Sequence, residues 1–127
     1  MRIPPSRGLF TAVLLAFGLG AASPALSASF NCAKAGTPDE KAICASRTLS
    51  DLDVQMATLY GVRMQIPMLM GERGAAQDEQ RAWLGQRGTC GGNQACLIQS
   101  YQQRIGELNQ TIAAAMQDYC TRLRLCG

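Results

Sequence analysis

The sequence contains no histidine. Because histidine is the usual general base near neutral pH and the commonest metal ligand, its absence excludes Ser-His and Cys-His nucleophile pairs and the most frequent kinds of metal site. The sequence also lacks a phosphate-binding loop, a dinucleotide-binding glycine motif and the G-x-S-x-G motif of hydrolases. We therefore expect a protein that is not an enzyme and that carries no cofactor.

Carboxylates are the remaining candidates for catalysis, since a glycosidase uses a pair of them. Glu72, Glu79 and Glu107 are available for such a pair. On helices, however, charged side chains usually lie on the face that meets solvent. We therefore interpret these three glutamates as surface residues.

Lysine is also scarce, with Lys34 and Lys41 the only two in the chain. The 12 Lys and Arg residues exceed the 9 Asp and Glu residues by three. Arg2 and Arg7 lie in an N-terminal segment that we predict below to be a signal peptide. Without that segment, the net charge is 10 − 9 = +1. No cluster of basic residues is present, so a nucleic-acid partner is not expected.

The N-terminus has the pattern of a secretory signal peptide, which we predict to span residues 1–28. Arg2 and Arg7 precede an apolar run at 8–22, and small residues follow it. The run is shorter than the roughly 20 residues that a membrane-spanning helix needs. We therefore expect cleavage to release residues 29–127 as a periplasmic or secreted bacterial domain with no membrane attachment.

All 6 cysteines follow the predicted signal peptide. Exported proteins reach an oxidising compartment, so we interpret the cysteines as a disulfide framework. Spacing does not select one pairing rigorously, but local pairing is the simplest interpretation: Cys32 with Cys44, Cys90 with Cys96, and Cys120 with Cys126. No C-x-x-C spacing is present, which disfavours a zinc or redox site.

Capping residues and apolar spacing predict an all-α domain. Thr37 and Glu40 form a capping box for a short helix that is expected to run through Cys44. A second helix is expected to begin near Thr48. It should end before Pro67, because the residue that precedes a proline avoids the helical region.

Two further helices are predicted after a turn at Gly71 and Gly74. The first carries a stripe of side chains at spacings of three and four, and the second begins near Asn93 and is the longest. The stripe consists of Ala76, Gln80, Trp83, Leu84 and Arg87, and the apolar seam of the longest helix consists of Leu97, Tyr101, Ile105, Leu108, Ile112 and Met116. No alternating pattern indicates a strand. The expected architecture is a small disulfide-stapled bundle of three longer helices plus a short N-terminal helix.

Gln80 and Arg87 share the stripe of Trp83, so we expect them to point toward a neighbouring helix. A buried arginine needs a partner. The apolar seam of the second helix consists of Leu49, Leu52, Met56, Leu59 and Tyr60. Asp53, which is adjacent to this seam, is the predicted partner. A functional pocket is the alternative interpretation of these residues.

Five groups of spaced residues form a further pattern. In chain order they are FNCAKA at 30–35, TPDEKAIC at 37–44, LSDLD at 49–53 with Tyr60, QRAWL at 80–84 with Arg87 and Cys90, and CL at 96–97 with Tyr101, Arg104, Ile105 and Leu108. Together they resemble the LprI-type lysozyme inhibitor domain family over about residues 30–108. The resemblance implies a helical, exported fold with four family cysteines, which match Cys32, Cys44, Cys90 and Cys96. Cys120 and Cys126 would form an additional ring at 120–126.

The resemblance also implies a non-catalytic envelope protein whose partner is a lysozyme. Binding surfaces favour aromatic and arginine anchors. The candidate binding or family-motif residues are therefore Asp53, Tyr60, Trp83, Arg87, Tyr101 and Arg104. The core is the alternative location for the aromatic residues, since they fall on apolar seams. Asp39, Glu40, Asp51 and Asp53 form the densest acidic stretch and are candidates for local contacts with a basic lysozyme.

Two other functions stay open. One is a structural envelope protein with an unknown partner. The other is a metal-binding protein, because the thioethers of Met64, Met68 and Met70 are soft ligands that suit Cu(I). The alternative interpretation of these methionines is a flexible apolar helix end.

Overall fold

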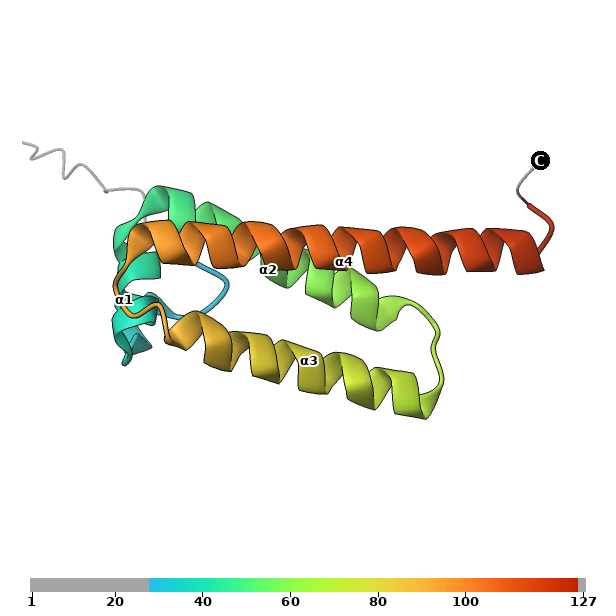
Figure 1. The fold of residues 1–127 in the computed structure, drawn as a ribbon, viewed down its shortest axis with the longest axis horizontal. Helices are drawn as coiled ribbons and strands as arrows, with labels where there is room; N and C mark the ends of the chain where they lie inside the picture. The colour runs from blue at the N-terminus through green and yellow to red at the C-terminus, as the bar shows by residue number, and fades with distance from the viewer. Residues whose placement is uncertain (1–27, 126–127) are drawn as a thin grey trace, which may run out of the picture.

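The computed structural model of the chain describes residues 28–125. The predicted signal peptide, apart from Ala28, and Cys126 lie outside these residues. Within them, α-helices follow a short 3-10 turn and no strand occurs (Figure 1). The elements are η1 Cys32–Lys34, α1 Pro38–Ala45, α2 Arg47–Gln65, α3 Met70–Gly88 and α4 Gln94–Arg122. The predicted all-α class, with three longer helices and a short N-terminal one, is confirmed.

A capping box fixes the start of α1. The Thr37 hydroxyl accepts a hydrogen bond from the backbone N–H of Glu40 at 3.4 Å. In return, the Glu40 carboxylate accepts from the backbone N–H groups of Gly36 and Thr37, at 2.7 and 3.2 Å. These two donors, Gly36 first, lower the pKa of the exposed Glu40 carboxyl. The predicted capping box is therefore confirmed.

Ser46 forms the junction between α1 and α2. Its backbone N–H donates to the carbonyl of Ile43 at 3.3 Å, which ends α1, and its hydroxyl accepts a backbone hydrogen bond from the first turn of α2. Because one residue ends one helix and caps the next, Thr48 lies inside α2, and the prediction that α2 begins near Thr48 was slightly late. The helix ends at Gln65, before Pro67, as predicted.

The prediction of a turn at Gly71 and Gly74 was wrong, because α3 begins at Met70 and contains both glycines. The turn comes earlier, directly after α2. The Glu72 carboxylate accepts a hydrogen bond from the backbone N–H of Leu69 at 3.2 Å and so stabilises the start of α3 at this point. A glycine inside a helix costs about 1 kcal/mol relative to alanine, and here that preference does not decide where the helix begins.

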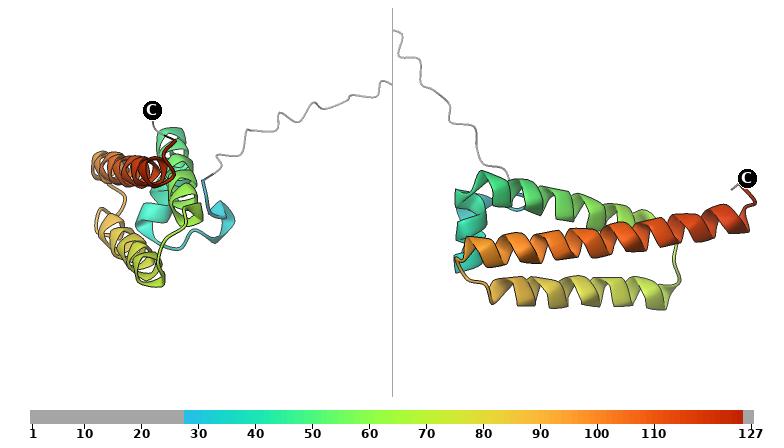
Figure 2. Two further views of the ribbon diagram at one scale, coloured as in Figure 1. Left: turned by 90° about the vertical axis from the view of Figure 1, so that its right-hand side faces the viewer. Right: turned by 45° about the horizontal axis from the view of Figure 1, so that its top comes forward.

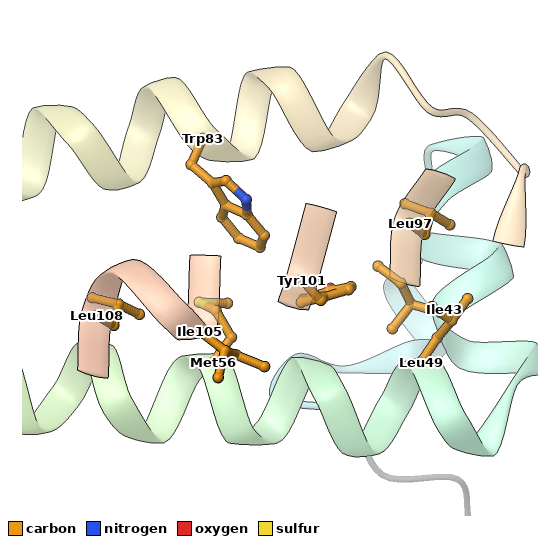
Figure 3. Close-up of a cluster of buried hydrophobic side chains, with 8 residues drawn as sticks. All are labelled: Ile43, Leu49, Met56, Trp83, Leu97, Tyr101, Ile105 and Leu108. Carbon is orange, nitrogen blue, oxygen red and sulfur yellow. The ribbon is translucent and has the colours of Figure 1, made fainter. Parts of the chain in front are cut away.

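The three longer helices lie roughly along one another, and α1 crosses one end of the group (Figures 1 and 2). The backbones of α2 and α4 are close along much of their length, whereas those of α3 and α4 approach at few positions. Side chains from all four helices meet in the core, as Figure 3 shows. The core residues are Ile43, Leu49, Met56, Trp83, Leu97, Tyr101, Ile105 and Leu108.

The longest helix outruns its partners. With 29 residues against 19 in α2 and 19 in α3, α4 extends past the other helices at its C-terminal end (Figure 1). The predicted seam of α4 is therefore buried only as far as Leu108. Met116, which has the same spacing, is 58% exposed because no other helix covers it. Leu84, predicted on the α3 stripe, is also an exposed residue. Among the described helices, none combines the length and the apolarity that crossing a membrane requires.

Two disulfides hold the end of the bundle that α1 closes. Cys32–Cys44 joins η1 to α1, and Cys90–Cys96 closes the loop between α3 and α4 onto the first turn of α4. Both pairings are as predicted. Cys120 is also disulfide-bonded. Its predicted partner, Cys126, lies outside the described residues, so the third pairing stays a prediction.

Candidate functional site

The guanidinium of Arg87 on α3 is buried, and its closest partner is Asp39 in the first turn of α1. Nε of Arg87 donates to Oδ2 of Asp39 at 3.0 Å, and Nη2 lies 3.0 Å from the same oxygen. The two side chains are only 8% and 5% exposed. Because an unpaired buried charge costs several kcal/mol, this ion pair fixes α1 against α3.

The third nitrogen of Arg87 links the same guanidinium to α2 and α4. Nη1 donates to the hydroxyl of Tyr101 at 3.1 Å, and that hydroxyl donates to Oδ1 of Asp53 at 2.8 Å. The predicted pair of Arg87 with Asp53 is confirmed, at 3.7 Å. The other oxygen of Asp53 accepts from the backbone N–H of Ser29 at 2.7 Å. These residues, with Asp39, form what we call the Arg87 network, and it joins all four described helices.

The predicted acidic stretch is not one surface. Asp39 and Asp53 are buried in the Arg87 network, Glu40 caps α1, and Asp51 is exposed and forms a surface ion pair with Arg47. The burial of Asp39 was not predicted from the sequence. An acidic residue in the first turn of a helix is usually exposed and interacts favourably with the helix dipole. In so short a helix, no apolar stripe marked which face points inward.

The network sets the protonation state of two of its members. Burial is the strongest influence on Asp39 and acts to raise its pKa, but the hydrogen bond with Thr37 and the charge and hydrogen bonds of Arg87 outweigh it, so the pKa is lowered. Burial, and after it the charge of Asp53, raises the pKa of Tyr101. At neutral pH the Tyr101 phenol is therefore protonated and donates to Asp53, while Asp39 is ionised opposite Arg87.

Trp83 and Tyr101 enclose the Arg87 guanidinium from the side of the core. Their rings meet edge to face, with centroids 5.4 Å apart and planes at 63°. The guanidinium carbon of Arg87 lies 5.7 Å from the Trp83 ring and 6.0 Å from the Tyr101 ring, within the range of cation–π attraction. Both aromatic side chains belong to the core (Figure 3). They are therefore placed to support a surface rather than to form its outer contacts.

A second buried cluster surrounds Arg104 on α4. Its Nε and Nη2 donate to Oε1 of Gln80 at 3.2 and 3.0 Å, and Nε2 of Gln80 donates to the sulfur of Met56 at 3.2 Å. Nη1 of Arg104 lies 3.2 Å from Oε2 of Glu107, which is half exposed. Gln80 therefore points inward, as the stripe predicted. Its partner, Arg104, was predicted as a candidate binding or family-motif residue and not as the partner of Gln80.

Neither cluster contains an unused polar group. In residues 28–125, every buried side-chain nitrogen and oxygen has a hydrogen-bond partner. No group of His, Cys, Asp and Glu side chains in this part of the chain has an arrangement that could hold a metal ion. The buried charged side chains therefore form ion pairs and hydrogen bonds with one another and with their neighbours. Their effect is to hold the four helices in one arrangement.

The remaining candidates lie apart from these clusters. Tyr60 on α2 is partly buried and packs against the core. Met64 lies near the end of α2, Met68 follows α2, and Met70 opens α3 with a nearly fully exposed side chain. The sulfur of Met68 accepts a hydrogen bond from Nη1 of Arg63 at 3.5 Å, which places a positive charge beside a donor atom that Cu(I) would need. This contact does not favour a copper site.

Two hollows lie on the surface of the described residues, and neither was predicted from the sequence. The larger, of about 640 Å³, lies between α3 and α4, where their backbones diverge. We call it the α3–α4 groove. Most of its lining is polar: Glu79, Gln86, Thr89, Gln99, Ser100, Gln103, Arg104, Glu107 and Thr111, together with Ala82, Trp83 and the Cys90–Cys96 disulfide. Trp83 and Arg104 are thus the two predicted candidates that reach this groove.

The smaller hollow, of about 510 Å³, is apolar and lies where the extension of α4 passes the end of α2. Its lining includes Val62, Ile66, Pro67, Met116, Tyr119 and Leu123. None of the predicted binding residues borders it.

Among the comparisons with known proteins, one gives a match. The family model for the lysozyme inhibitor LprI matches residues 32–108. No curated protein and no solved structure is similar enough to give a match. The matched segment contains both described disulfides, the four side chains of the Arg87 network, and Arg104 with Gln80 and Glu107.

Proposed function

The chain belongs to the lysozyme inhibitor LprI family, and on that premise we propose that it is a non-catalytic protein of the bacterial cell envelope that binds and inhibits a lysozyme. The observation that carries this proposal is the match over residues 32–108, which takes in every buried charged residue of the described fold.

The rigidity of the scaffold supports a binding role. A protein loses less entropy on docking when its surface is already fixed. Here Cys32–Cys44, Cys90–Cys96 and the Arg87 network hold α1, α3 and the start of α4 together. The exposed side chains nearby are therefore presented in one arrangement, as a tight inhibitor requires.

The disulfides also support a location outside the cytoplasm, since such bonds persist in oxidising compartments. Together with the predicted signal peptide at residues 1–28, they favour the periplasm or the external medium. Both locations would bring the protein to the same place as lysozyme that attacks the cell wall.

The burial of the predicted anchor residues indicates which part of the protein can contact a lysozyme. Trp83, Arg87, Tyr101 and Arg104 were candidates for anchors, but all four are buried and have partners within the fold. We infer that they shape and stiffen the surface, and that exposed residues above them contact the lysozyme.

A clearing assay tests the proposed function. Residues 29–127, purified with the disulfides intact, should slow the lysis of peptidoglycan by at least one of several lysozyme types and should be retained by that lysozyme in a pull-down. The reduced and alkylated protein is the control, and it should lose both effects. Unchanged lysis at saturating protein across all types would leave a structural envelope protein as the better reading.

A further inference from the structure

We propose that the α3–α4 groove is the site that receives the lysozyme, and that it takes a lysine or arginine side chain of that enzyme between Glu79 and Glu107. This inference rests on the proposed function for the identity of the partner. The charge of the groove, its unused hydrogen-bonding groups and its fixed walls point to this ligand class independently.

The charge of the groove is negative. Its lining contains two carboxylates, Glu79 and Glu107, and one cation, Arg104. The guanidinium of Arg104 is already occupied, because it donates twice to Gln80 and forms an ion pair with Glu107 at 3.2 Å. An anionic ligand would therefore meet repulsion from Glu79 with no free cation to offset it, whereas a cationic ligand would be attracted.

Glu79 differs from every other acidic residue of the chain. All 9 Asp and Glu residues lie within the described residues. Asp39, Glu40, Asp51, Asp53, Glu72, Asp78, Glu107 and Asp118 each form a hydrogen bond or an ion pair within the fold. Glu79 forms none in the described part of the chain, and it lines the groove. Its carboxylate is thus available for a partner from outside.

Glu107 is held ready for a second contact. Its Oε2 faces Arg104, and its Oε1 accepts a hydrogen bond from Nε2 of Gln103 at 3.1 Å. An ionised carboxylate can accept further hydrogen bonds at both oxygens. A cation can therefore approach Glu107 without first breaking a contact, and the carboxylate does not need to change its orientation.

Neutral polar groups complete the lining. The side chains of Gln86 and Gln99 border the groove and form no hydrogen bond within residues 28–125. Amide oxygens accept hydrogen bonds from ammonium and guanidinium groups, and the five N–H donors of an arginine need several acceptors at once. A volume of about 640 Å³ lies within the range of ligand pockets, so the groove has room for more than one partner side chain.

The walls of the groove are fixed. Trp83 at its inner side packs on Tyr101, and its Nε1 donates to the carbonyl of Ser100 at 3.4 Å. The Cys90–Cys96 disulfide closes one end. The inner side and this end of the groove therefore do not need to rearrange on docking, which favours tight association.

A charge-matched pair of double variants tests the inference. Glu79→Gln with Glu107→Gln, the groove variant, removes both carboxylates and leaves Arg104 as the charged residue of the lining. Asp51→Asn with Asp118→Asn removes the same charge from exposed positions outside the groove. Calorimetry with a lysozyme that the native protein inhibits should show about tenfold weaker binding for the groove variant and less than about twofold for the control. The native affinity should fall with added salt more steeply than that of the groove variant. Glu79→Gln alone, which breaks no contact within the fold, should also weaken binding.

Trp83 provides a readout that does not depend on lysozyme. It is the only tryptophan of the chain and it lines the groove. A short arginine- and lysine-rich peptide should change its fluorescence in the native protein, and should not do so in the groove variant or when an acidic peptide is used. If lysozyme is not bound but the basic peptide is, the proposed function fails and the groove assignment stands.

The opposite results overturn the inference. Inhibition that is equally strong in the native protein and in the groove variant would place the lysozyme contact elsewhere, while the proposed function survives. A fluorescence change with chitotriose in place of the basic peptide would make the groove a sugar site.

Discussion

Arg87 and Asp39 are 48 residues apart in the chain and form a buried ion pair in which Nε and Nη2 both lie 3.0 Å from one carboxylate oxygen. This contact joins the shortest helix, α1, to α3. Because α1 has only eight residues, it buries little apolar surface of its own. We infer that α1 holds its place through this ion pair, the Cys32–Cys44 disulfide and the side chain of Ile43.

Replacement of Arg87 with methionine should destabilise the protein strongly. The methionine fills similar space but leaves Asp39 and Asp53 buried without their cation, and breaking a buried pair in this way costs about 3–5 kcal/mol. Urea unfolding, followed by circular dichroism, measures the loss. Arg81→Met is the matched control on the same helix, since its ion pair with Asp78 is exposed and should contribute less than about 1 kcal/mol. Equal stability of the two variants would show that Arg87 is not structurally paired in solution.

Replacement of Tyr101 with phenylalanine should cost about 1–3 kcal/mol, because the hydroxyl that accepts from Arg87 and donates to Asp53 disappears and leaves a buried acceptor with one partner fewer. The ring and its contact with Trp83 remain. Tyr119→Phe on the extension of α4 serves as the control, and its unfolding free energy should match that of the native protein. A loss of similar size in both variants would contradict the bridging role.

Tyr101 also predicts sensitivity to alkali. Its pKa is raised in the folded protein, so folding favours the protonated phenol. The resulting stabilisation is fully present below the ordinary pKa of 10.0 and is lost as the pH rises above that value. The native protein should therefore melt at progressively lower temperature above this pH. Tyr101→Phe should show a shallower decline, and parallel curves for the two proteins would refute the assignment.

Asp39 predicts the behaviour in acid. Its pKa is lowered in the folded protein, so folding favours the ionised carboxylate. The contribution to stability is present above the ordinary value of 3.8 and is lost as the pH falls below it through the lower, folded value. Thermal melting measured from neutral pH down to pH values below 3.8 should show this loss of stability. Asp39→Asn should start less stable and lose less on acidification, whereas Asp51→Asn should follow the native curve.

Much of this fold could be predicted from local patterns in the sequence. The capping box of Thr37 and Glu40, the stop imposed by Pro67 and the start at Asn93 all depend on residues within one turn of the boundary. Gly71 and Gly74 misled the prediction because glycine lowers helix stability only slightly, and a nearby cap at Leu69 and Glu72 decides where the helix begins.

The site was harder to predict, because it depends on which surfaces meet. The stripe on α3 correctly indicated that Gln80 and Arg87 point inward. It did not indicate Asp39, which lies in a helix too short to show a period, nor Gln80's partner Arg104. The α3–α4 groove had no sequence signal at all, since it arises where two backbones diverge and polar side chains on both helices look like ordinary solvent-facing residues.

The two described disulfides should contribute unequally. In the chain-entropy model, closing a loop of this size stabilises by about 2–3 kcal/mol, with the shorter loop at the lower end. Cys32–Cys44 spans 12 residues and Cys90–Cys96 spans 6. The first bond also fixes the N-terminal segment whose Ser29 N–H donates to Asp53. We therefore expect the double variant Cys32→Ser with Cys44→Ser to lose more unfolding free energy than Cys90→Ser with Cys96→Ser, by urea titration of both at one pH. The reverse order would mean that the loop beside the α3–α4 groove, rather than the N-terminal segment, is the part of the fold most dependent on its cross-link.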